Sequence, residues 1–306
     1  MSGLAPGGGL YVPSTFPKFT ASDLKSFQSL EFWEIAHQIA TYFIDEEIPS
    51  KKVKNICQDA YNFPITIKAS PSTDFLELFH GPTAAFKDYA ARFMGRCCSY
   101  FLQQEPRETV LLVATSGDTG GAVGEGFKGL PGVKVFILFP ENGVSGVQEQ
   151  QLCTMGQNIQ AVKVQGSFDD CQALVKEVFK QESLNQVYNL MSANSINIGR
   201  ILPQSFYYAW ASLQYSQQKK PLNIVIPSGN LGNLTGAVWA KKMGFPINHI
   251  VAAHNINDPF VNYTKGFKFV PRPSEATLSN AMDVGSPNNY YRLNYYFKDQ
   301  APDYLF

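Results

Sequence analysis

The sequence has few charged residues and no excess of either sign. Only 16% of its 306 residues are charged, and 25 basic side chains balance 25 acidic ones. A strong basic excess is typical of proteins that bind nucleic acid or anionic membranes, so we expect neither partner. No uninterrupted apolar run is long enough to cross a bilayer, and the first residues do not resemble a signal peptide. These absences favour a cytoplasmic protein.

Residue patterns that bind metals or build disulfide frameworks are also missing. The four histidines include no HExxH pair, and the five cysteines include no CxxC spacing. We therefore expect no metal site and interpret the cysteines as free thiols. The absence of GxxxxGK[ST] and GxSxG argues against P-loop nucleotide triphosphatases and α/β-hydrolases. Residues 124–129 match GxGxxG but end a predicted helix instead of following a strand, so we interpret this match as coincidence.

Apolar side chains are abundant: 44% of the residues are hydrophobic and 13% are aromatic. From residue 110 onward, short apolar runs alternate with helix-like segments, which is typical of parallel strands covered by helices on both faces. The predicted fold class is α/β, with doubly wound, mostly parallel sheets in two lobes. The predicted strands are residues 110–114, 133–139, 159–164, 187–191, 224–226 and 250–253, and the predicted helices are residues 119–127, 147–155, 170–181, 201–215 and 234–243.

The first part of the chain predicts an arm followed by helices. Residues 1–19 are rich in Gly and Pro, which favours a surface arm. Residues 30–44 and 51–61 carry apolar side chains at helical spacing. Between residues 65 and 79, two short alternating stretches predict a hairpin or a pair of edge strands.

A lysine lies at the start of a further predicted helix. Residues 84–103 are mostly good helix formers, and Pro82 suits the opening position of a helix. Lys87 would then lie near the positive end of the helix dipole, where the ammonium form is disfavoured, and burial would lower its pKa further. A neutral amine prepared in this way can attack an aldehyde. The alternative is a solvated lysine paired with Asp88 or Asp118.

Two glycine-rich turns follow predicted strands, at the edge of the sheet where ligands bind in doubly wound folds. The later turn, residues 227–236, has no charged side chain and opens a helix, so its N–H groups suit a phosphate dianion. The earlier turn, residues 115–121, offers hydroxyls and amides to a carboxylate, whereas its Asp118 would repel a dianion. The alternatives are a tight turn with a polar cap and a simple helix cap.

A third polar cluster, residues 192–200, lies between a strand and a helix. Asn194, Ser195 and Arg200 offer donors of the kind that bind phosphate or carboxylate. The alternative is an arginine that pairs with a nearby acid. A lysine of lowered pKa, a neutral phosphate-binding turn and a separate anion site together suggest pyridoxal phosphate chemistry on an amino acid.

Five motifs along the chain resemble those of the threonine synthases. The resemblance extends over essentially the whole chain. It implies a fold-type-II pyridoxal 5'-phosphate enzyme, similar in architecture to the tryptophan synthase β subunit, that converts O-phospho-L-homoserine and water into L-threonine and phosphate. The motifs are HGPTAAFKD at residues 80–88, ATSGDTG at 114–120, SANSINIGR at 192–200, PSGNLGNLTG at 227–236 and ATLSNAMDVGSPNN at 276–289.

The resemblance also implies roles for individual residues. Lys87 is expected to bond to the aldehyde of the cofactor and then to move protons at Cα and Cβ of the substrate. Asp118 takes the place, near the ring oxygen of the cofactor, where many relatives have Asn. The cofactor phosphate is expected at Gly229, Asn230, Leu231, Gly232 and Asn233, the substrate carboxylate at Ser116, Gly117 and Thr119, and the substrate phosphate at Asn194, Ser195 and Arg200.

We expect three segments along the chain. Residues 1–85 form an N-terminal region and the lead-in to the lysine helix, residues 86–200 a smaller α/β lobe, and residues 201–306 part of the larger cofactor-binding lobe. The resemblance implies a further C-terminal portion, which normally completes the sheet and supplies the Ser or Thr that faces the pyridine nitrogen. A phospho-lyase acting on a phosphoamino acid and a truncated, non-catalytic remnant are the alternative functions. We expect a monomer or homodimer whose partner is its small-molecule substrate.

Overall fold

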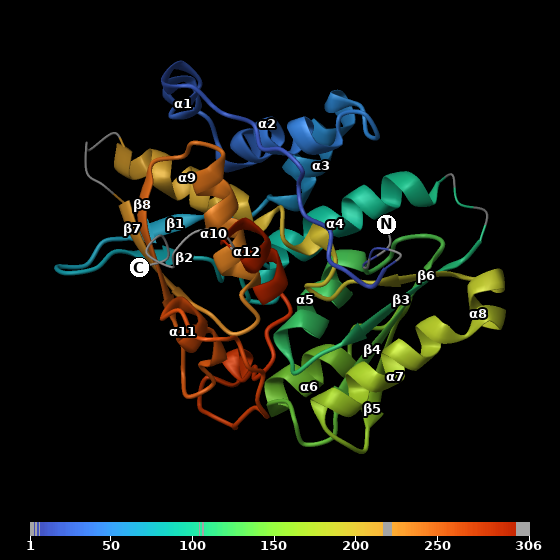
Figure 1. Cartoon of the computed structure of the whole chain (residues 1–306). Coiled ribbons are helices and arrows are strands. Elements are labelled where there is room, and N and C mark those ends of the chain that lie inside the picture. The colour runs from blue at the N-terminus through green and yellow to red at the C-terminus, as the bar shows by residue number, and fades with distance from the viewer. Residues whose placement is uncertain are drawn as a thin grey trace.

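The computed structural model describes residues 3, 5, 7–103, 105, 107–216 and 222–297. Figure 1 shows the arrangement of the elements. The strands are β1 (Thr66–Lys68), β2 (Phe75–Glu77), β3 (Thr109–Ala114), β4 (Val133–Pro140), β5 (Ile159–Val164), β6 (Asn189–Ser192), β7 (Leu222–Pro227) and β8 (Ile247–Ala253). The helices are α1 (Ala21–Phe27), α2 (Phe32–Ile44), α3 (Ser50–Ala60), α4 (Lys87–Leu102), α5 (Asp118–Phe127), α6 (Gly146–Cys153), α7 (Phe168–Lys180), α8 (Glu182–Val187), α9 (Gln204–Ser216), α10 (Gly232–Lys242), α11 (Pro259–Thr264) and α12 (Tyr290–Phe297), with 3₁₀ turns η1 (Ile198–Arg200) and η2 (Asn280–Met282).

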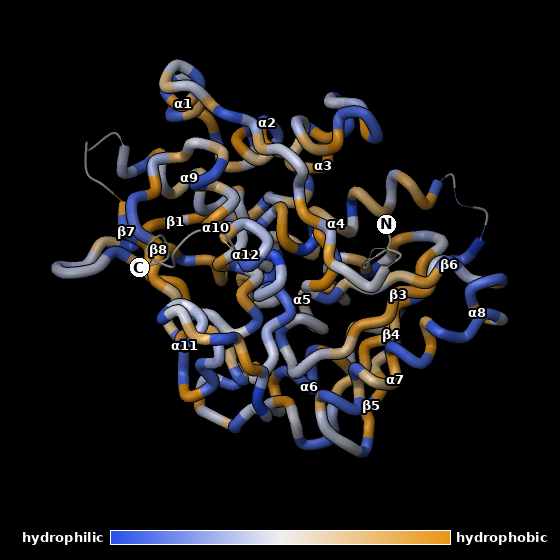
Figure 2. Tube along the Cα trace, viewed as in Figure 1, coloured by the Kyte–Doolittle hydropathy of each residue, from blue (hydrophilic) through white to orange (hydrophobic). Residues whose placement is uncertain are grey.

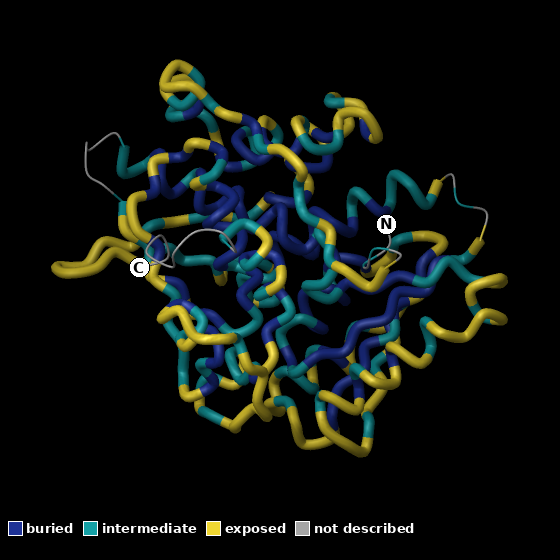
Figure 3. Tube along the Cα trace, in the orientation of Figure 1, coloured by how far each residue is buried: buried dark blue, intermediate teal, exposed yellow. Residues whose placement is uncertain are grey.

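The larger sheet is parallel throughout and has the order β5-β4-β3-β6. Strand β3 is buried along its whole length. Its alternate side chains contact different layers: Leu111 and Val113 pack with α4, α5 and α6, whereas Val110 and Leu112 pack with α7. Figures 2 and 3 show the corresponding apolar, buried strands at the centre of this lobe. Helices on both faces confirm the predicted doubly wound α/β fold.

A second parallel pair, β7 with β8, lies in the other lobe. Helices α9 and α10 pack together beside it. The apolar faces of α2 and α3 join the same core, which includes the fully buried Trp239 of α10. The short strands β1 and β2 pair antiparallel, which confirms the predicted hairpin. The boundaries at residues 85 and 200 stay a prediction, and residues 298–306 of the last predicted segment lie outside the described residues.

Several predicted boundaries are wrong by two or three residues. Helix α4 begins at Lys87 instead of residue 84, because Ala84 has a left-handed φ of 55° that a right-handed helix does not accept. Pro82 therefore lies in the preceding turn and not at the opening helical position. Val187 ends α8 and does not begin a strand, and the predicted helix at residue 201 starts at Gln204, after η1.

The five cysteines are free, as predicted. Burial raises the pKa of the Cys98 thiol to about 12, so this thiol is unreactive at neutral pH. In the part of the chain that the structure describes, no helix is long and apolar enough to span a membrane. Within the same residues, no group of three or more His, Cys, Asp or Glu side chains could hold a metal ion.

Candidate active site

A cavity of about 1230 Å³ brings most of the predicted site residues together. Its walls include residues at the carboxyl ends of β3, β6 and β7, the start of α4, and residues from 281 to 288. Ligands of doubly wound sheets bind at this edge. Gly117 and Leu231 do not line the cavity, whereas the other predicted residues do: Lys87, Ser116, Asp118, Thr119, Asn194, Ser195, Arg200, Gly229, Asn230, Gly232 and Asn233.

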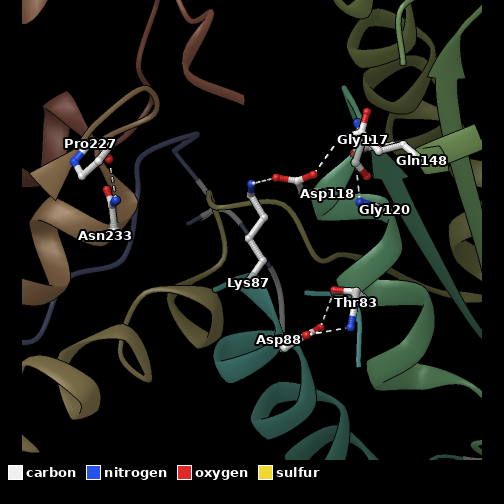
Figure 4. Close-up of polar contacts among 10 residues, drawn as sticks. Thr83, Lys87, Asp88, Gly117, Asp118, Gly120, Gln148, Pro227 and Asn233 are labelled. Atoms are coloured by element: carbon white, nitrogen blue, oxygen red, sulfur yellow. Dashed lines mark hydrogen bonds and ion pairs between the residues drawn. The ribbon is translucent and has the colours of Figure 1, made fainter. Parts of the chain in front are cut away.

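Lys87 extends from the first turn of α4 into this cavity, between the turn that contains Asn233 and the loop that contains Asp118 (Figure 4). Its side chain is 17% exposed, and its Nζ donates to Oδ2 of Asp118 at 3.1 Å. Burial lowers the pKa of the Lys87 amine; the Asp118 carboxylate opposes this shift, and the positive charge of Arg200 reinforces it. The amine therefore loses its proton more readily than a surface lysine does.

The turn before Lys87 is held by the residue that follows it. Asp88 is fully buried, and its carboxylate accepts the backbone N–H of Thr83 at 2.9 Å and the Thr83 hydroxyl at 2.7 Å. These bonds close the turn that contains the left-handed Ala84. The contact between Asp88 and Thr83 thus fixes where α4 starts and, as a result, the direction of the Lys87 side chain.

Asp118 begins α5 and faces two donors. Its Oδ2 accepts from Lys87, and its Oδ1 accepts from Nε2 of Gln148 at 2.7 Å. Burial acts to raise the pKa of Asp118, but the charge of Lys87 and the donated hydrogen bonds outweigh it and lower the pKa below its ordinary value. The carboxylate is therefore ionised and forms an ion pair with the lysine at neutral pH.

The loop between β3 and α5 folds around the hydroxyl of Thr115, which binds the loop itself and not a ligand. Thr115 is buried, and its Oγ1 accepts the N–H of Gly117 at 3.0 Å and of Gly120 at 2.9 Å. Gly117 has a φ of +134°, and a Cβ there would lie 2.3 Å from the Gln148 amide carbon. Glycine is required at this position. Ser116 is then left to face the cavity.

The turn between β7 and α10 also depends on close packing. A Cβ on Gly229 would lie 2.7 Å from Cα of Met282, so only glycine fits against that backbone. Leu231 has a left-handed φ of 60° and a buried side chain, so it can offer a ligand only its backbone. The side chain of Asn233 donates to the Pro227 carbonyl at 2.8 Å, so this amide is already bound within the turn and leaves only the backbone N–H for a cofactor.

Asn230 joins the two anion-binding segments predicted from the sequence. Its Nδ2 donates to Ser195 Oγ at 2.7 Å, and its Oδ1 accepts the N–H of Asn288 at 2.6 Å. Asn194 is occupied differently: its amide exchanges hydrogen bonds with the backbone of Ala114, at 2.7 Å and 3.3 Å. Asn194 thus fixes the ends of β3 and β6 together and has little left to offer a substrate phosphate.

Arg200 lies in the cavity wall and forms no salt bridge with any residue that the structure describes. It is buried, and its Nη1 donates to the Ala193 carbonyl at 2.5 Å. Its Nε has no partner in the described part of the chain. Burial lowers the pKa of Arg200 to about 10, although Asp88 opposes the shift. A buried guanidinium with an open donor is suited to an anion from the cavity.

Arg292 is another buried cation, and its role was not predicted from the sequence. It is fully buried, and it donates to the carbonyls of Ser195 at 2.8 Å, Ile196 at 2.6 Å and Tyr11 at 2.9 Å. Asn289 supplies a fourth acceptor at 2.5 Å. Arg292 therefore ties α12 and the N-terminal arm to the loop that precedes Arg200. No local pattern around residue 292 indicates this role.

The cavity fits a cofactor that carries both an aldehyde and a phosphate. At the start of α10, the N–H groups of Gly232 and Asn233 donate to no oxygen of the described residues. Such unpaired N–H groups at a helix N-terminus bind phosphate. Across the same cavity lies the Lys87 amine of lowered pKa, the group that condenses with aldehydes.

Comparison with known proteins agrees with this chemistry. Residues 1–61 match the family described as threonine synthase N terminus, and residues 76–299 match the pyridoxal-phosphate-dependent enzyme family. Threonine synthase from Escherichia coli is 42% identical over 299 residues, which are 97% of this chain and 69% of the relative.

Solved structures agree with the family matches. The crystal structure of the Escherichia coli threonine synthase superposes with a TM-score of 0.90 at 41% identity, over 97% of this chain and 69% of that one. A pyridoxal-phosphate-bound threonine synthase from Brucella melitensis also gives a TM-score of 0.90, at 35% identity, over 98% of this chain and 66% of that one. Because the family model, the sequence relatives and the solved structures agree, the chain belongs to the threonine synthase family of pyridoxal-phosphate-dependent enzymes, which have fold type II.

Proposed function

We propose that this protein is a threonine synthase that converts O-phospho-L-homoserine and water into L-threonine and phosphate. The observation that carries the proposal is the Lys87 amine, buried in a cavity that has separate groups for two anions. One group is the start of α10, and the other contains the open donor of Arg200. A phosphorylated cofactor and a phosphorylated substrate need two such places in one cavity.

The start of α10 would hold the cofactor phosphate. The N–H groups of Gly232 and Asn233 would donate to it, and Gly229 keeps the turn compact beside Met282. When bound, pyridoxal phosphate supplies an aldehyde and a ring that stabilises negative charge on the carbon atoms of an amino acid. Lys87 would hold the aldehyde end, since its amine faces the same cavity.

Lys87 would also move protons at Cα and Cβ of the substrate. Its lowered pKa leaves a larger neutral fraction to accept a proton at neutral pH. The ionised Asp118, 3.1 Å from Nζ, would stabilise the ammonium form after each proton has been accepted. One amine placed near both carbons provides the orientation that the reaction needs.

The substrate would lie between the remaining walls. Its carboxylate would bind at Ser116 and Thr119, close to the start of α5, and Gly117, which does not line the cavity, would shape the turn that carries them. Its phosphate would bind Arg200, with Ser195 beside it, while Asn194 keeps that wall attached to β3. Over the whole reaction, the bond from Cγ to the phosphate oxygen breaks and Cγ gains a proton to become a methyl group. Cβ loses one hydrogen and gains the hydroxyl of water, whose other proton leaves with the phosphate.

The test is product analysis with the purified chain, pyridoxal phosphate and O-phospho-L-homoserine. Threonine and phosphate should form in equal amounts. A parallel assay replaces O-phospho-L-homoserine by phosphothreonine. Formation of 2-oxobutyrate there, with no threonine from O-phospho-L-homoserine, would support a phospho-lyase instead. Absence of cofactor uptake and of any product would support a non-catalytic remnant.

The proposal also includes the compartment, the partner and the lobes of the enzyme. We propose a cytoplasmic enzyme, a monomer or homodimer, whose partner is its small substrate. The balanced net charge argues against nucleic acid and anionic membranes as partners. We also propose that residues 86–200 form the smaller lobe, that residues 201–306 belong to the larger cofactor-binding lobe, and that residues 1–85 lead into α4.

A further inference from the structure

Gln148 connects helix α6 to the pair formed by Lys87 and Asp118. Its Nε2 donates to Asp118 Oδ1 at 2.7 Å, while Lys87 Nζ donates to Oδ2 of the same carboxylate at 3.1 Å. Figure 4 shows the carboxylate between these two side chains. Its two oxygens are therefore held by donors from two different helices.

The start of α6 determines which end of the Gln148 amide faces Asp118. The Ser145 backbone N–H donates to Gln148 Oε1 at 2.9 Å, and the Gln148 backbone N–H donates to Ser145 Oγ at 3.3 Å, which makes a capping box. A backbone N–H can only donate, so the amide oxygen faces Ser145 and the amide NH₂ faces Asp118. The NH₂ group also only donates, so Asp118 Oδ1 must accept.

We propose that Gln148 is a positioning residue that holds the Asp118 carboxylate ionised and turned toward the Lys87 amine. The inference rests on the proposed function because it takes Lys87 as the reacting amine. The hydrogen bonds among the three side chains exist whether or not that function is correct. Protonation of Asp118 at Oδ1 would break the hydrogen bond from Gln148. Rotation of the carboxylate would break the hydrogen bonds from both side chains, so each bond protects the other.

The nearest other acidic side chains have partners of their own and do not compete for Lys87 or Gln148. Glu149, next to Gln148, pairs with Lys163 of β5 at 2.6 Å. Asp88 is turned into the preceding turn by its hydrogen bonds with Thr83. The elements packed against α5 carry the charged side chains Lys87, Asp88, Arg92 and Arg96 on α4, Glu149 on α6 and Lys134 on β4, and α5 itself carries Glu125. Arg200 on η1 adds a positive charge that acts on Lys87.

The first test measures the pKa of the Lys87 amine in the full chain without added cofactor. The rate of its acylation by an amine-specific reagent is followed against pH, with the Lys87 peptide quantified by mass spectrometry. Gln148→Glu preserves the capping box, because Glu is also a capping-box partner at this position, but it replaces the donor to Asp118 by a carboxylate. We expect the pKa of Lys87 to rise by about one unit, because negative charge is added nearby.

The matched control is Gln150→Glu, which adds the same charge at an exposed position on the same helix. A rise with Gln148→Glu that is absent from Gln150→Glu supports the proposal, and equal shifts or none would overturn it. Gln148→Ala provides a second variant in case Gln148→Glu fails to fold. It removes the donor to Asp118 without adding charge, so it should lower the pKa of Lys87, because the carboxylate is then less firmly held toward the amine.

A second readout uses the active enzyme. With Gln148→Glu, the acidic limb of the kcat/KM profile should move to higher pH by about one unit, because the neighbouring carboxylate makes Asp118 harder to ionise. A loss of rate that is the same at every pH would indicate a merely structural role and would overturn the proposal. If the acylation shift occurs but no threonine forms, the proposed function fails while the positioning role of Gln148 stands.

Discussion

Asp88 and Thr83 are joined by two hydrogen bonds that close the turn in front of the reactive lysine. The carboxylate is fully buried. Burial raises the pKa of Asp88, and the two bonds from Thr83 oppose that shift without cancelling it. The residue that orients α4 therefore also makes the stability of the fold depend on pH.

The sign of that dependence follows from the raised pKa. Between the unfolded pKa, about 4, and the higher folded one, the native state binds more protons than the unfolded state, so stability falls as pH rises through this window. Asp88→Asn cannot ionise and keeps an oxygen for the Thr83 N–H. We expect the difference in Tm, variant minus wild type, to increase as pH is raised from about 4 to 8. A difference that stays constant over calorimetric scans in this range would contradict the prediction.

Lys87→Ala should abolish both turnover and covalent retention of the cofactor. The reason is that no other amine replaces Nζ in the cavity wall, within the described residues. The measurement is borohydride reduction of the loaded protein followed by peptide mass analysis, together with an assay for threonine. Lys180→Ala, at a solvent-exposed lysine, is the control and should behave as wild type. Retained turnover in Lys87→Ala would show that the lysine assignment is wrong.

Arg200→Ala should mainly weaken binding of the phosphorylated substrate. A hydrogen bond to a charged group contributes about 1.5–3 kcal/mol, so KM should rise roughly ten- to a hundredfold, with a smaller change in kcat. Inorganic phosphate should inhibit the variant correspondingly less. Arg107→Ala, at a half-exposed arginine, is the control. An unchanged KM together with reduced kcat would place the substrate phosphate elsewhere.

Gly229→Ala should displace the segment around Met282 and loosen the proposed phosphate site. A Cβ at this position would lie 2.7 Å from the Met282 backbone, and overpacking of this kind costs about 1–3 kcal/mol. We expect a lower Tm and faster loss of cofactor on dialysis. The same substitution at Gly146, where a Cβ meets nothing within 4 Å, should leave cofactor retention unchanged. Similar behaviour of the two variants would mean that close packing at Gly229 is not required.

The sequence predicted the architecture because its signals are local. Alternating apolar runs and helical segments predicted the parallel sheet of β3 to β6, and the glycine-rich turns predicted where ligands would meet it. The lysine was correctly expected at the start of a helix. The helix boundary was wrong because Ala84 adopts a left-handed conformation that its residue type does not suggest.

The side-chain partners in the site could not be predicted in the same way. Gln148 meets Asp118 across 30 residues of sequence, and Asn194 meets Ala114 across 80. Such contacts arise only when the sheet has formed, and the residue types involved are common. The role expected for Asn194 therefore missed its competing backbone partner. The buried side chain of Leu231 likewise follows from packing that no turn motif encodes.

The hydrogen bond from Arg292 to the Tyr11 carbonyl joins residues that are 281 positions apart in the chain. During synthesis on the ribosome, this contact of the N-terminal arm therefore cannot form before Arg292 has emerged. The carbonyls of Ser195 and Ile196 accept from the same guanidinium, so this loop also lacks these partners until Arg292 is present. A nascent chain that ends before residue 292 contains every strand of both parallel sheets but lacks the guanidinium that binds this loop, so the wall beside Arg200 depends on contacts of long sequence separation.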